Sequence, residues 1–136
     1  MSLKFVNPPS VHAPLGLYTH SVVVPAGTEL IYLSGQLGVA QDGSAPPTIG
    51  EQADLVFKNI VLLLQAHGLE PSSIVKLTTF MVAGHDGDAV RAARLKYLGP
   101  HRPASTAVFV SQLVEPSWFV EVEAVAARVR STTGAA

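Results

Sequence analysis

Two glutamates near the C-terminus are the first candidates for chemistry. Glu121 and Glu123 are two residues apart in an apolar segment, so on a strand both side chains point to the same side. A carboxylate there is costly unless it is paired, hydrogen-bonded or solvated in a cleft, and burial would raise its pKa and suit it to proton transfer. Two interpretations remain open. Either Glu121 works on a proton in a cleft, or both carboxylates form ion pairs with the basic residues Lys76, Arg128 or Arg130.

A serine and a glycine interrupt a second strand-like segment, Leu30 to Gly38. A glycine inside a strand indicates a β-bulge or a close approach of another backbone. It also allows a ligand to approach the backbone at Gly35, with the Ser34 hydroxyl as a hydrogen-bond donor. The segment is not a phosphate-binding loop, because the G-x-G-x-x-G pattern is absent and no lysine follows.

Three further residues could line a ligand site. Arg102 lies at a loop-to-strand junction, where its guanidinium fork could bind a substrate carboxylate or simply solvate a turn. Ser105 follows in the same junction. Tyr18 could form a pocket wall or anchor the proline-rich N-terminal segment. No nucleophile and base have a recognisable spacing, so these residues alone do not name a reaction.

Metal and cofactor chemistry find no support in the sequence. The five histidines show neither an H-x-H nor an H-E-x-x-H pattern. The chain has no cysteine, which excludes disulfides, thiolate catalysis and cysteine-ligated zinc. We therefore expect no metal site.

Composition indicates one oligomeric domain. Residues 1–136 are few enough for a single domain. Only 14% are charged, against about 25% in typical domains, which suggests that apolar surface is buried against another subunit. The net charge of −1 and scattered basic residues do not favour nucleic acid as a partner. The N-terminus does not read as a signal peptide and no stretch is long enough to span a bilayer, so we expect a cytoplasmic protein.

The elements that must position these residues follow from periodicity and turn signals. Residues 1–16 are expected to be irregular or edge-like, and helix 86–98 can begin at Asp86 or Asp88. The predicted order is β-β-α-β-α-β-β, with strands at 21–24, 30–37, 74–82, 105–113 and 118–128 and helices at 51–67 and 86–98.

Two helices suffice to cover one face of one sheet, so the other face needs a different cover. The last strand is largely apolar on both faces. We therefore expect the uncovered face to pack against neighbouring subunits in a closed homo-oligomer.

Taken together, several segments resemble the Rid family of reactive-intermediate deaminases, in order and over nearly the whole chain. They are residues 14–24, 30–38, 52–68 with Phe57-Lys58-Asn59, 75–80, His101-Arg102-Pro103-Ala104, and 120–128. The resemblance implies a chorismate-mutase-like (ferredoxin-like) α+β fold, with a mixed sheet and both helices on one face. It also implies a homotrimer with a central barrel and a cleft at each subunit interface.

The same resemblance implies a chemistry. Active members hydrolyse short-lived enamines and imines such as 2-aminoacrylate to 2-oxo acids and ammonia, without a metal or organic cofactor. Glu121 matches the family's glutamate that positions or activates water. Tyr18 and Ser34 match pocket positions. The family's carboxylate-binding arginine follows Pro-Ala, and Ser105 stands at that position here.

This departure keeps several functions open. The chain could be a divergent hydrolase in which Arg91, Arg94 or Arg102 replaces the missing arginine. It could instead be a non-catalytic trimer that binds a small metabolite as a sensor or scavenger. Older family names suggest an endoribonuclease or translation inhibitor, which the net charge and the missing basic stripe do not favour.

Overall fold

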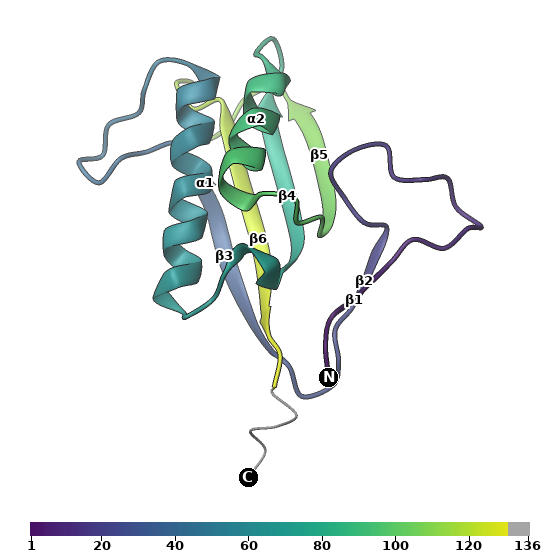
Figure 1. Cartoon of the computed structure of the whole chain (residues 1–136). Coiled ribbons are helices and arrows are strands. Elements are labelled where there is room, and N and C mark those ends of the chain that lie inside the picture. The colour runs from purple at the N-terminus through teal and green to yellow at the C-terminus, as the bar shows by residue number, and fades with distance from the viewer. Residues whose placement is uncertain (131–136) are drawn as a thin grey trace.

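One mixed sheet with two helices on a single face forms the body of the molecule (Figure 1). The computed structural model describes residues 1–130. The sheet order is β3-β6-β4-β5, with β4 and β5 parallel and the other neighbours antiparallel. Its elements are β3 (Glu29–Leu37), α1 (Ile49–Ala66), β4 (Ile74–Val82), α2 (Gly87–Leu98), β5 (Ala104–Val110) and β6 (Val120–Arg128). The predicted α+β class and the placement of both helices are confirmed.

A polar cap at its start and a glycine after its last turn define helix α1. The Thr48 hydroxyl accepts a hydrogen bond from the Glu51 backbone N–H at 3.2 Å and donates one to the Glu51 carboxylate at 2.9 Å. This arrangement satisfies an otherwise unpaired N–H group and begins the helix two residues earlier than predicted. Gly68, with φ of 68°, follows the last turn and ends the helix as expected.

Helix α2 begins at an aspartate cap and is fastened to α1. Asp86 accepts a hydrogen bond from the Asp88 N–H at 2.9 Å, which decides between the two predicted caps. Asp54 of α1 forms an ion pair with Lys96 at 2.8 Å and accepts a hydrogen bond from the Tyr97 hydroxyl at 2.8 Å. These contacts hold the two helices side by side above the sheet.

The two faces of the sheet differ in how they are covered. Paired residues of neighbouring strands share a face, and the row Leu77, Ala124 and Leu33 is buried under the helices. On the opposite face, Tyr32 is 74% exposed and Val108 is 40% exposed. We call this second side of the sheet the open face.

The N-terminal region corrects one sequence prediction. Residues 1–16 were expected to be irregular or edge-like, which agrees with a single short strand, β1 (Lys4–Val6), that pairs antiparallel with β2 (Ser21–Val23). This short ribbon stands apart from the main sheet as an arm (Figure 1). A turn at Pro25 and Gly27, the latter with φ of 81°, separates it from β3. The first predicted strand therefore pairs with β1 instead of joining the main sheet.

Two strand boundaries are also corrected. β5 ends at Val110 and not at Leu113, and its pairing with β4 ends where the Ala83 N–H donates to Val110 O at 2.9 Å. β6 begins at Val120 and not at Trp118, because the Trp118 N–H closes a turn onto Glu115 O at 3.0 Å.

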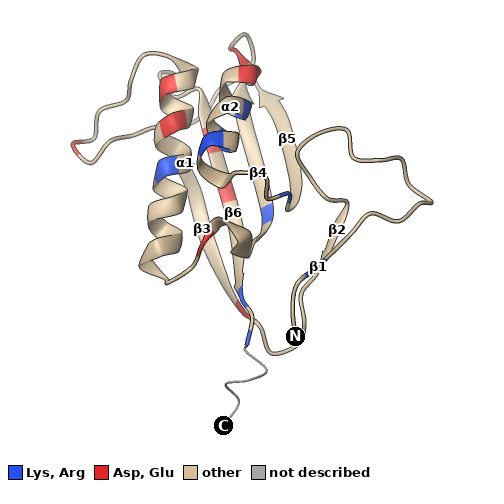
Figure 2. Cartoon of the chain, viewed as in Figure 1, with Lys and Arg blue, Asp and Glu red and all other residues tan. Residues whose placement is uncertain are grey.

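Charged side chains are dispersed over the body. Lys and Arg lie on α1, α2, β4 and β6 and in the segment before β5, without forming a continuous stripe (Figure 2). None of the helices among the described residues has the length and hydropathy needed to cross a membrane.

Candidate functional site

The Glu121 carboxylate lies against an interruption in strand β3. The register between β3 and β6 shifts between Leu33 and Gln36, which forms a β-bulge in β3. Within this bulge the side-chain amide of Gln36 donates a hydrogen bond from Nε2 to Ser34 O at 3.0 Å. A Cβ atom at Gly35 would lie 2.2 Å from Glu121 Oε2. The glycine therefore makes room for the carboxylate. The register shift confirms the expected bulge, while the atoms that approach Gly35 belong to a side chain and not to another backbone. A ligand at this backbone stays a prediction.

Glu121 and Glu123 do not form ion pairs with the basic side chains considered in the sequence analysis. Arg128 pairs with Glu29 at 3.3 Å, and Lys76 donates to the Thr106 hydroxyl at 2.9 Å. Within residues 1–130, Glu121 and Glu123 take part in no ion pair. The ion-pair interpretation is therefore wrong for the described chain, and Glu121 is a half-buried carboxylate on the open face.

The predicted residues Tyr18, Arg102 and Ser105 belong to a second group. The segment around Thr19 packs along the start of β5, since Thr19 N–H donates to Pro103 O at 3.1 Å and its hydroxyl donates to Arg102 O at 2.6 Å. Arg102 in turn donates to Gly16 O at 3.2 Å. These contacts place the loop that carries Tyr18 next to the β5 entry.

Tyr18 acts as an anchor in this loop. Its hydroxyl accepts a hydrogen bond from the Leu15 N–H at 3.0 Å, and its ring contacts His20 edge to face with centroids 5.5 Å apart. The anchor interpretation is thereby supported, while a role as a pocket wall stays a prediction.

Arg94 is the arginine that reaches Ser105. Its Nη2 atom donates to the Ser105 hydroxyl at 3.2 Å and to Leu17 O. Burial, followed by repulsion from Arg102 and Arg91, lowers the pKa of Arg94 to about 10. The guanidinium is therefore charged at neutral pH, in surroundings that contain two more cations.

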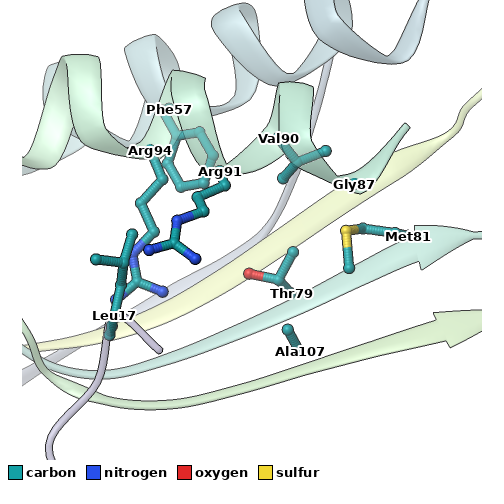
Figure 3. A pocket seen from close by; sticks show the side chains of 9 residues that line it. All are labelled: Leu17, Phe57, Thr79, Met81, Gly87, Val90, Arg91, Arg94 and Ala107. Carbon is teal, nitrogen blue, oxygen red and sulfur yellow. The ribbon is translucent and has the colours of Figure 1, made fainter. Parts of the chain in front are cut away.

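A cavity of about 170 Å³ lies beside this arginine, between α2 and the helix side of the sheet. Figure 3 shows the Arg91 and Arg94 side chains descending from α2 toward Leu17 at one end, with Val90, Met81 and Gly87 toward the other. Phe57, Thr79 and Ala107 complete the lining. The cavity is cationic at one end and apolar at the other.

The two groups lie on opposite faces of the sheet. Ser105 pairs with Leu77, whose side chain is buried under the helices. Glu121 pairs with Phe80, three residues further along β4 and therefore on the open face. One chain thus brings Ser34, Gly35 and Glu121 together, and separately Tyr18, Arg102 and Ser105. It does not bring the two sets to one ligand.

One positioning residue was missed by the sequence reasoning. Gln52 is fully buried, and its amide accepts from Phe119 N–H at 2.8 Å and donates to Pro46 O and Ser117 O at 2.9 Å. These bonds fix the entry to β6 just before Glu121. The available signal was a glutamine four residues before Val56 on the apolar stripe of a helix.

The described residues offer no obvious metal ligands. Across residues 1–130, no three His, Asp or Glu side chains are grouped closely enough to hold a metal ion. Within the two groups of predicted residues, the Glu121 carboxylate and the guanidinium groups beside the cavity still have hydrogen-bonding capacity for a ligand. This arrangement is suited to binding an organic anion and to moving a proton.

Known proteins resemble this chain over nearly its whole length. The sequence profile of the endoribonuclease L-PSP family matches residues 10–128. The 2-iminobutanoate/2-iminopropanoate deaminase of Bos taurus is 30% identical over 132 residues, which cover 96% of this chain and 93% of that protein.

Solved structures show the same fold. The Rid-family protein YyfB from Yersinia pestis, described as of unknown function, superposes with a TM-score of 0.80 at 23% identity, covering 93% of this chain and 98% of its own. Escherichia coli TdcF with bound serine has a TM-score of 0.68 at 26% identity, covering 93% of this chain and 99% of its own.

Proposed function

Because the chain belongs to the Rid family, which the endoribonuclease L-PSP profile describes, we propose that it hydrolyses a small imine or enamine. The reaction takes place in a cleft between two copies of the chain. Relatives that are 29% and 30% identical to this chain are named 2-iminobutanoate/2-iminopropanoate deaminases. The observation that carries the proposal is the Glu121 carboxylate, held against Gly35 on the open face without a cationic partner in residues 1–130.

The placement of the two groups supports a shared site. Glu121 and Ser105 lie on opposite faces of the sheet, so a ligand touching both needs the open face of one copy and the β5 side of another. The open face carries apolar side chains suited to such packing, among them Leu30, Tyr32 and Val108. We take the assembly to be a homotrimer with these faces lining a central barrel.

The chemistry needs one carboxylate and one water molecule. As the water oxygen bonds to the imine carbon, Glu121 accepts a proton from the water and delivers it to the imine nitrogen, which gives a carbinolamine. Glu121 then accepts the hydroxyl proton and delivers it to the amine, so that the carbonyl group forms, the carbon–nitrogen bond breaks and ammonia leaves. Ser34, Ser105, Tyr18 and Arg102 would orient the substrate, with the Gly35 backbone beside it.

A trapping assay tests the proposal. 2-Iminopropionate is generated in situ with an amino-acid oxidase, and semicarbazide captures whatever the protein has not hydrolysed. We expect the protein to suppress semicarbazone formation, and Glu121→Gln to reduce this activity about 100-fold. Glu123→Gln is the matched control, because Glu123 lies on the same strand and face but is exposed. Equal activity of Glu121→Gln and the unaltered protein would contradict the proposal.

A non-catalytic binding protein is the second candidate. Ser105 stands where the resemblance calls for an arginine, and the cations beside the cavity are suited to ligand binding without turnover. This candidate predicts saturable stabilisation by a small metabolite and no product. A metabolite panel that leaves the melting temperature unchanged would count against it.

A further inference from the structure

Building on the hydrolase function above, we propose that helix α1 positions the reacting carboxylate through two side-chain amides, those of Gln52 and Asn59. We call these two residues the amide pair. Gln52 holds the segment that leads into β6, and Asn59 holds the end of the neighbouring strand β3. Together they fix β6, which carries Glu121, relative to β3, which carries Gly35, so that the carboxylate stays against the glycine.

The side chain of Gln52 binds backbone groups only. It is fully buried on the apolar stripe of α1, where an amide is costly unless it is hydrogen-bonded. Its Oε1 atom accepts from the Phe119 N–H at 2.8 Å, and its Nε2 atom donates to Ser117 O and Pro46 O, both at 2.9 Å. The amide therefore fixes the course of the main chain at the entry to β6.

The backbone of Phe119 is held on both of its polar sides. Gln52 binds its N–H group, and its carbonyl oxygen accepts a hydrogen bond from the Val82 N–H at 2.9 Å. Glu121 follows only two residues later in the same strand. A shift of the β6 entry is therefore passed on to the backbone that carries the carboxylate.

Asn59 holds the strand on the other side of this pairing. It lies seven residues after Gln52, about two helical turns along α1, and therefore on the same side of the helix. Its Nδ2 atom donates to Leu37 O at 3.4 Å and to Val39 O at 3.3 Å. Leu37 is the residue of β3 that pairs with Glu121 in the sheet. The amide pair thus holds both members of one cross-strand pair, with longer and weaker bonds on the Asn59 side.

Two glycines let α1 and the carboxylate approach β3 from opposite sides. A Cβ atom at Gly38 would lie 2.5 Å from the Gln52 Cα atom, so the chain at the end of β3 packs directly against the α1 backbone. A Cβ atom at Gly35 would overlap the Glu121 carboxylate on the open face. No side chain of β3 separates α1 or the carboxylate from the strand at these two points, so the placement of the strand sets the placement of the carboxylate.

This placement matters for the rate because Glu121 has to move protons. A general base must lie within about 2.6–3.2 Å of the group from which it takes the proton. A misplacement of about 1 Å can lower a rate about 100-fold. The amide pair contacts backbone groups and not the Glu121 carboxylate, so both residues are positioning residues. Their loss should lower kcat and leave KM nearly unchanged.

Two variants of the amide pair test the inference in the trapping assay, run at several rates of imine supply to separate kcat from KM. Gln52→Met keeps the length of the side chain and removes its three hydrogen bonds, and Asn59→Leu removes the two weaker ones. We expect kcat to fall about 30-fold in Gln52→Met and about fivefold in Asn59→Leu, with KM changed less than about twofold. Asn59 is half-buried, so its variant keeps the test open if Gln52→Met does not fold.

Leu64→Ala is the matched control for stability. It removes a fully buried side chain from the same helix and leaves the amide contacts in place. We expect it to lower the melting temperature by several degrees and to leave kcat unchanged when every variant is assayed below its melting temperature. A comparable loss of kcat in Leu64→Ala would show that general destabilisation explains the effect and would overturn the inference.

A double-mutant cycle shows whether the amide acts through the carboxylate. In the Glu121→Gln background, Gln52→Met should cost no further activity, because there is no carboxylate left to position. If the two losses multiply, Gln52 supports the site by another route and the inference is wrong.

Carbon-13 NMR of the glutamate side-chain carboxyl groups tests the positioning without any turnover. The Glu121 signal is identified by its absence from the spectrum of Glu121→Gln. We expect Gln52→Met and Asn59→Leu to shift this signal more than that of the exposed Glu123, and Leu64→Ala to leave both signals in place. A Glu121 signal that does not move in either amide variant would contradict the inference.

The outcomes separate the inference from the hydrolase proposal. A Glu121 signal that moves in the amide variants, with no suppression by the unaltered protein in the trapping assay, would retain the positioning and remove the hydrolase. Suppression by the unaltered protein, with an unmoved signal and unchanged kcat in both amide variants, would retain the hydrolase and remove the positioning.

Discussion

The open face and the helix side of the sheet carry opposite charges that are left uncompensated in residues 1–130. On the open face, Glu121 sits in a space created by Gly35 and has no cationic partner. On the helix side, Arg94 is held by Leu17 and Ser105 and has no anionic partner. The sheet separates the two groups, so they cannot neutralise each other within one chain.

In a third region, between α1 and α2, opposite charges are paired with each other. Asp54, Lys96 and Tyr97 form a closed set of contacts between the two helices, all at 2.8 Å. Those groups are satisfied by each other and have no need of a ligand. The contrast supports the proposal that Glu121 and Arg94 meet an external partner, whereas the contacts of Asp54 stabilise the packing of the two helices.

Gly35→Ala tests the open face and should give the largest effect. The new Cβ atom would overlap the end of the flexible Glu121 side chain and displace the carboxylate, with little change in the fold. We expect imine hydrolysis to fall about 100-fold, as for Glu121→Gln. The double variant Gly35→Ala/Glu121→Gln should lose no more activity than either single one. Additive losses, measured in the trapping assay, would show that Gly35 acts independently of Glu121.

Asp54→Asn tests the compensated region. Lys96 lowers the pKa of Asp54 below its ordinary value, so the ionised carboxylate stabilises the fold at neutral pH. This contribution is present above about pH 4 and is lost as the pH falls through the lowered pKa. We expect the variant to melt about 2 °C lower at pH 7, with the difference vanishing in acid. Thermal unfolding from pH 2 to 7 measures this difference in melting temperature. A loss of ligand binding in Asp54→Asn would contradict the separation between the helix pair and the site residues.

Arg91→Gln tests the cationic end and should give the smallest shift in stability. Burial and neighbouring cations lower the pKa of Arg94 to about 10. At every pH below about 10 Arg94 carries its charge in the folded chain, and this charge makes the folded chain less stable relative to the unfolded one. Removing one of the repelling charges should raise the melting temperature of the ligand-free protein by about 1 °C. A lower melting temperature would mean that Arg91 contributes a stabilising contact and is not held in place for a ligand.

Much of the fold follows from local sequence signals. The apolar stripe of α1, the stop at Gly68 and the β-branched runs predicted the helices and the main strands. The mixed sheet with both helices on one face was implied by the resemblance to the Rid family. The N-terminal strand was not predictable in this way, because Lys4–Val6 has only three residues and gains its strand character from β2. Pairing with a distant segment leaves no local pattern.

The candidate site was predictable only in part. The two-residue spacing of the glutamates placed Glu121 and Glu123 on one face, and the glycine in β3 signalled the bulge that the structure contains. The choice of Arg94 over Arg91 and Arg102 as the neighbour of Ser105 depends on how α2 lies over β5, which no spacing in the sequence reveals. Gln52 gave one signal, a polar side chain on the apolar stripe of α1, but its hydrogen bonds to the segment before β6 follow only from the structure.

The central claim is that a working site needs residues from two copies, and mixed oligomers test it most directly. Glu121→Gln and Arg94→Gln chains are purified separately, unfolded, mixed in equal amounts and refolded together. If each site takes its glutamate from one copy and its arginine from the next, about a quarter of the sites in random mixtures recover both groups. We predict that the mixture regains about a quarter of the unaltered activity, whereas each parent alone keeps only its own reduced activity. A mixture no more active than its parents would contradict the account.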